Sequence, residues 1–136
     1  MPPRRRTDPA AGRAAALAAA ADLAAGRTPE RSRLATAVRW SLEELSTRHP
    51  GNHVEVRVPP FGAVQVLPGP RHTRGTPPAV VETDGVTWLQ VVVGERGFGA
   101  ALDEGRIRAS GLRADLSDLL PLLRTGEPSG DVPSSP

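Results

Sequence analysis

The chain has 136 residues, enough for one domain with a single hydrophobic core but not for two. Its formal net charge is +2, and it contains no cysteine, which excludes disulfides and thiolate chemistry. No apolar run approaches the roughly 18 residues that a transmembrane helix needs. We therefore expect a cytoplasmic protein without stable membrane insertion.

The positive charge is concentrated at the start of the chain. Residues 1–33 carry seven arginines against three acidic residues, so residues 34–136 have a small negative charge. A mildly acidic body argues against a nucleic-acid-binding core. The short PPRRR stretch lacks interleaved aromatic residues, so we expect no nucleic-acid partner.

Two helices are predicted to open the structure. Asp8 is placed as N-cap, with Pro9 in the first turn and Gly26 beyond the end, which predicts an alanine-rich helix over residues 8–26. Because alanine buries little surface, we expect this helix to dock loosely, after a disordered segment at residues 1–7.

The second helix is predicted to start with Thr28 as cap and Pro29 in its first turn, and to end before Pro50. Its apolar stripe has helical spacing and consists of Leu34, Val38, Leu42 and Leu45.

Strands are predicted next. Alternating valines at residues 54–58 indicate a half-buried strand, and residues 61–68 are its simplest antiparallel partner. A proline-rich loop at residues 69–78 separates them from a short third strand at residues 79–83. A further strand is predicted at residues 106–111.

The remaining elements are helical or ambiguous. Residues 88–93 fit a strand by their run of valines, but Asp84 as N-cap and Gly94 beyond the end fit a helix. A short helix is predicted over 97–105. A terminal helix is predicted over 114–123, followed by a disordered tail at 125–136. Helices and strands segregated in this way favour an α+β sandwich, with helices on one face of a sheet.

Catalytic and metal-binding motifs are not found. The chain has no G-x-S-x-G, and its three histidines (His49, His53 and His72) fall in loops or at strand edges. Gly97 and Gly99 are not followed by a third glycine at the dinucleotide-binding spacing. We therefore expect no enzyme activity, no metal and no cofactor.

Two features leave alternatives open. Arg71, His72 and Arg74 form a basic cluster that is either an anion or headgroup site or a solvated loop. The apolar helix faces are either ordinary core or the lining of a cavity. The residues of those faces are Trp88, Leu89, Val92, Phe98, Leu102, Leu116, Leu119, Leu120 and Leu123.

Long segments of the chain resemble a known family. The segments are LATAVRWSLEELSTRHPGNHVEVRVPPFGAVQ, GPRHTRGTPPAVVETDGVTWL and ALDEGRIRASGLRADLSDLLPLL. They resemble the sterol carrier protein 2 (SCP2)-like proteins, in particular the short actinobacterial form called bacterial SCP orthologue. The resemblance places the SCP2-like domain at residues 28–124 and favours a helix at TWLQVVVG.

The resemblance implies a five-stranded mixed sheet with helices on one face and an apolar tunnel between the two layers. It implies a small non-enzymatic protein that binds a fatty acyl, sterol-like or other hydrophobic ligand, with the nine apolar residues above as the tunnel lining. The alternative is a structural or accessory module, acting in dimerisation or partner packing, with no ligand of its own. A sealed core in a homodimer would favour the accessory module, and a monomer with an open tunnel would favour ligand binding.

Overall fold

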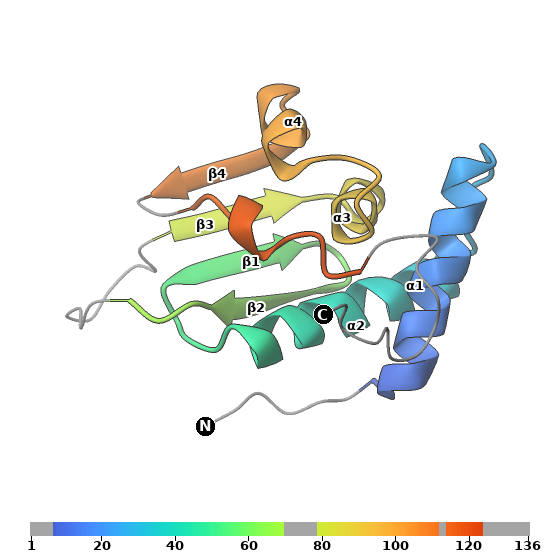
Figure 1. Ribbon diagram of the computed structural model, residues 1–136, viewed down its shortest axis with the longest axis horizontal. Coiled ribbons are helices and arrows are strands. Elements are labelled where there is room, and N and C mark those ends of the chain that lie inside the picture. The colour runs from blue at the N-terminus through green and yellow to red at the C-terminus, as the bar shows by residue number, and fades with distance from the viewer. Residues whose placement is uncertain (1–6, 70–78, 112–113, 124–136) are drawn as a thin grey trace, which may run out of the picture.

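The computed structural model describes residues 7–69, 79–111 and 114–123. The elements are α1 (Pro9–Ala24), α2 (Arg31–Arg48), β1 (Val54–Val58), β2 (Gly62–Val66), β3 (Ala79–Thr83), α3 (Gly85–Val92), α4 (Phe98–Asp103), β4 (Ile107–Gly111) and a 3-10 turn at Ser117–Leu119 (Figure 1). The mixed α+β class expected from the sequence is confirmed. None of the described helices is long and apolar enough to cross a membrane.

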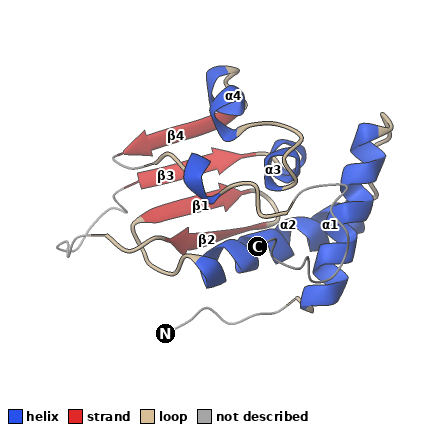
Figure 2. Ribbon diagram, viewed as in Figure 1, coloured by secondary structure: helices blue, strands red, loops and turns tan. Residues whose placement is uncertain are grey.

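The strands form one mixed sheet in the order β2-β1-β3-β4 (Figure 2). β1 pairs antiparallel with β2, as the sequence predicts, and parallel with β3, which pairs antiparallel with β4. The described residues thus form four strands, not the five implied by the family resemblance.

The two faces of the sheet differ in chemistry. On β1 the side chains of Val54, Val56 and Val58 are buried, and Leu42 of α2 packs over the neighbouring β2 at Gly62. The opposite face carries charged side chains from three adjacent strands. This alternation follows from the two-residue period of a strand, and it directs the valines into the core.

The charged side chains form a ladder across β1, β3 and β4. Glu55 and Arg57 are 2.7 Å apart, and Arg57 lies 4.0 Å from Glu82 on the neighbouring strand. Glu82 in turn pairs with Arg108 at 2.9 Å. These pairs are partly exposed, so each contributes little to stability.

Helix α1 begins as the sequence predicts but docks differently. The Asp8 carboxylate accepts a 2.9 Å hydrogen bond from the N–H of Ala11, and Pro9 is the first helical residue. The expectation of loose docking is wrong, because Gly12 lies directly against Trp40 of α2. A Cβ atom on Gly12 would lie 2.3 Å from Trp40 Cγ, so the close approach requires glycine.

Helix α2 starts later than predicted. Its N-cap is Glu30 rather than Thr28, and its first helical hydrogen bond runs from Leu34 N to Glu30 O at 2.9 Å. The predicted stripe is buried at Val38, Leu42 and Leu45 and half-buried at Leu34.

The ambiguous segment is a helix, α3. The Asp84 carboxylate accepts hydrogen bonds from Thr87 N at 2.7 Å and from Thr87 Oγ1 at 3.0 Å. Gly94, just beyond the end, has a φ of +82°, the left-handed conformation that ends many helices. These two local signals prevail over the β propensity of the valines.

The predicted terminal helix is wrong. Only Ser117–Leu119 forms a turn of 3-10 helix, and Leu120 is already extended, with φ −122° and ψ 148°. Pro121 explains this, because proline disfavours helical conformation in the preceding residue and cannot donate a helical hydrogen bond. Residues 114–123 are called the terminal segment below.

Candidate functional site

The nine residues assigned to a tunnel lie together in the structure. Trp88, Leu89, Val92 and Leu116 have no exposed surface, Phe98 and Leu123 are buried, and Leu102, Leu119 and Leu120 are half-buried. All nine belong to one hydrophobic cluster or pack against it. Among the described residues they form packed core, and an open tunnel is not seen.

One polar contact lies inside this core. The indole Nε1 of Trp88 donates a 2.7 Å hydrogen bond to Oγ of Ser41, and Ser41 Oγ donates to the carbonyl of Val38 at 2.7 Å. The indole is therefore satisfied and its ring faces apolar neighbours. The interior between sheet and helices offers contacts suited to an apolar group.

The terminal segment closes this interior without regular secondary structure on either side of its short turn. In Figure 1 it passes from β4 across the sheet toward α1 and α2. Leu122 N and Leu123 N both donate to the carbonyl of Val92, at 2.9 and 3.2 Å. Arg48 Nη1 of α2 adds a 3.1 Å hydrogen bond to the carbonyl of Leu122.

A carboxylate shapes the start of the terminal segment. Asp115 accepts hydrogen bonds from Ser117 Oγ at 2.5 Å and from Ser117 N at 2.9 Å. These bonds, the hydroxyl bond foremost, lower the pKa of Asp115 below its usual range. The ionised side chain thus supports the turn that directs Leu116 into the core.

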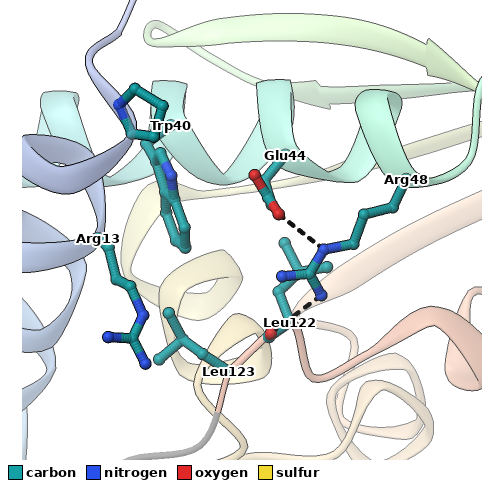
Figure 3. A pocket seen from close by; sticks show the side chains of 7 residues that line it. Arg13, Trp40, Glu44, Arg48, Leu122 and Leu123 are labelled. Atoms are coloured by element: carbon teal, nitrogen blue, oxygen red, sulfur yellow. Dashed lines mark hydrogen bonds and ion pairs between the residues drawn. The ribbon is translucent and has the colours of Figure 1, made fainter. Parts of the chain in front are cut away.

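A surface cleft of about 360 Å³ lies beside the terminal segment, where it meets α1 and α2 (Figure 3). Arg48 Nε pairs with Glu44 Oε2 at 2.8 Å, whereas Arg13 makes no hydrogen bond or ion pair with any described residue. The cleft is lined by Pro9, Arg13, Trp40, Glu44, Arg48, Leu122 and Leu123.

Sequence reasoning found only Leu123 of this cleft. A signal was present on α2, because Trp40, Glu44 and Arg48 follow one another at intervals of four residues and therefore share a helix face. Arg13 gave no such signal, since its position depends on how α1 crosses α2.

The other candidates of the sequence lie elsewhere. Arg71, His72 and Arg74 fall outside the described residues, so the basic loop stays a prediction. His53 is buried, and both ring nitrogens lack a hydrogen-bond partner. Within the described ranges, no three His, Asp or Glu side chains are placed to hold a metal ion.

Comparison with known proteins identifies the family of the chain. The family model described as bacterial SCP ortholog matches residues 30–122. The chain belongs to this family. A comparison with curated proteins finds no match.

The residues that line the cleft lie partly inside and partly outside the matched region. The bacterial SCP ortholog region includes all of α2, the four strands and most of the terminal segment. Helix α1 precedes that region, so Pro9 and Arg13 lie outside the matched residues.

Proposed function

We propose that this bacterial SCP ortholog binds a lipid or another hydrophobic small molecule, without covalent chemistry, between its sheet and its helices. Fatty acyl and sterol-like molecules are the ligand classes considered. The observation that carries the proposal is the apolar interior around Trp88 and Leu89, which shares one hydrophobic cluster with Leu116, Leu122 and Leu123 of the terminal segment. Family membership supports it.

The terminal segment is suited to act as a displaceable wall. Its buried leucines, Leu116, Leu122 and Leu123, each contribute about 1.5–3 kcal/mol by burial, and few hydrogen bonds join it to the helices. An acyl chain of about twelve methylenes would gain about 10 kcal/mol on entering the same space, at about 0.8 kcal/mol per methylene. Burial of the acyl chain thus contributes at least as much as burial of the three leucines, so an entering acyl chain can replace them.

A structural or accessory module is the second candidate, and the close packing of Trp88, Leu89 and Val92 favours it. In that case the leucines are permanent core, and the protein acts through its outer surface, as a homodimer or against another protein.

Two measurements distinguish these functions. Native mass spectrometry of the purified protein and titration with fluorescent fatty acids and sterols should detect saturable binding of an apolar ligand. Hydrogen exchange should then show that the amides of Leu122 and Leu123 lose protection when ligand is added, while the amide of Val56 in β1 does not. Absence of any binding, together with a dimer by light scattering, would overturn the proposal in favour of the accessory module.

A further inference from the structure

We propose that the cleft lined by Arg13 and Arg48 binds the anionic head of a straight-chain amphiphile, with Arg13 as its counter-ion. The head is a carboxylate or a phosphate monoester. This inference rests on the proposed function in one respect, since the chain of the same ligand is taken to enter the core beside the terminal segment.

Among the described residues that line the cleft, arginines outnumber glutamates by one. Two arginines and one glutamate line it, and Arg48 already engages both Glu44 and the carbonyl of Leu122. The guanidinium of Arg13 has five N–H donors and makes no bond to a described residue. One anionic group placed here would neutralise the excess charge and accept two hydrogen bonds from the guanidinium.

The rest of the cleft is apolar. The indole of Trp40 and the side chains of Leu122 and Leu123 line it beside the two guanidinium groups (Figure 3). A purely ionic ligand, such as free phosphate, would contact only the guanidinium groups, because Trp40, Leu122 and Leu123 already pack in the core and present only their edges to the cleft. An amphiphile uses both kinds of surface, because its head meets Arg13 and its first methylenes meet the leucines.

The cleft also adjoins the terminal segment, which is the part of the structure proposed to move. Leu122 and Leu123 line the cleft through their side chains, and their amides hold the terminal segment to Val92. A ligand whose head is held at Arg13 therefore has its chain against the two residues whose displacement opens the core. The cleft is thus the position at which the ligand binds before its alkyl chain enters the core.

Helix α1 sets the position of this counter-ion. Gly12 packs on Trp40 so closely that α1 cannot shift inward, and the next residue, Arg13, is thereby held at the rim of the cleft. Helix α1 lies outside residues 30–122, so the proposed site joins residues inside and outside the matched region.

The test compares ligands that differ only in the head group. Laurate, dodecyl phosphate and dodecanol are titrated by calorimetry into the full chain and into R13Q. The control is R39Q, because Arg39 is an exposed arginine of α2 that lies outside the cleft. We expect R13Q to weaken laurate or dodecyl phosphate about tenfold, to leave dodecanol unchanged, and R39Q to leave all three unchanged.

The position of the head group is tested with the two tryptophans. In W88F only Trp40 fluoresces, and in W40F only Trp88. Laurate brominated next to its carboxylate should quench Trp40 in W88F more strongly than Trp88 in W40F, and bromination at the far end of the chain should reverse the order.

The outcomes separate the two proposals. Equal affinity of the wild-type chain for laurate, dodecyl phosphate and dodecanol would overturn the head-group site and leave the proposed function standing. A loss of dodecanol binding in R13Q would also overturn it, because the substitution would then act on the apolar part. If none of the three binds but a sterol does, the head-group site fails and the proposed function stands; if neither the three nor a sterol binds, the proposed function itself fails. The stronger of the two anions identifies the head.

Discussion

The indole nitrogen of Trp88 donates its hydrogen to Ser41, and neither side chain has exposed surface. This contact joins α3 to α2 in the middle of the core. Ser41→Ala would leave the indole N–H buried without an acceptor, which costs about 1–3 kcal/mol. We expect S41A to lower the free energy of unfolding by that amount in urea denaturation.

Ser46→Ala is the matched control. The hydroxyl of Ser46 is also buried, but it bonds only the carbonyl of Glu43 within its own helix. Removing this hydroxyl leaves no donor on another element without an acceptor. S46A should therefore lower the free energy of unfolding clearly less than S41A does. Equal losses would show that the indole finds another acceptor when Ser41 is removed.

Gly12→Ala should destabilise the protein, although alanine normally stabilises a helix by roughly 0.5–1 kcal/mol over glycine. The new methyl group would overlap Trp40, so α1 must move away from α2. Thermal unfolding should show a lower Tm, and hydrogen exchange should show lost protection in α1.

Gly99→Ala provides the opposite case. Gly99 lies in α4, and a Cβ atom there would meet nothing within 4 Å. G99A should therefore raise the stability by several tenths of a kcal/mol. If G12A and G99A both raised the stability, the tight packing of Gly12 on Trp40 would be disproved.

His53→Leu should stabilise the fold by about 1 kcal/mol. Both ring nitrogens of His53 are buried without partners, and the ring packs directly against Gly69. An apolar side chain at this position removes the desolvation penalty and keeps most of the packing. H53N retains an unpaired polar group and should give no gain. A loss of stability in H53L, measured by urea denaturation, would contradict the prediction.

Asp22 links α1 to the start of α2. It pairs with Arg27 at 3.0 Å and with Arg33 at 3.2 Å, and these contacts, led by the hydrogen bond from Arg27, lower the pKa of Asp22. A lowered pKa in the folded state means that the stabilisation is fully present above about pH 4, the unfolded value. It is lost as the pH falls through the lower folded value.

Asp22→Asn should therefore lower the stability at pH 7 and lose this effect toward pH 3, where the wild-type carboxylate also becomes neutral. The measurement is the midpoint of urea denaturation at pH 7 and at pH 3. Asp103→Asn is the control, since Asp103 is exposed and has no ion pair with a described residue. A difference between D22N and wild type that persists unchanged at pH 3 would contradict the ionic origin.

Most elements were predictable because their signals are local. Asp8 and Asp84 cap the helices that the sequence assigns to them, and the alternating valines of β1 form the predicted strand. The leucines of the terminal segment also fit a helical period, but Pro121 imposes a local constraint that periodicity does not include.

The parts of the site that depend on contacts across the chain could not be predicted. The docking of α1 depends on Gly12 meeting Trp40, and the cleft depends on the terminal segment reaching α2. The apolar faces of the predicted helices assigned the tunnel residues to one group, and the structure brings them together. Whether they enclose a ligand depends on movement of the terminal segment, which hydrogen exchange can measure.

The charged side chains on the face of the sheet opposite the buried valines also favour one alignment of the strands. A slip of two residues is the smallest shift of β3 along β1 that keeps the valines inward. Such a slip places Glu82 beside Glu55 instead of Arg57, so two carboxylates meet where an ion pair stood. The exposed pairs, although weak individually, thereby disfavour misregistered sheets while the protein folds.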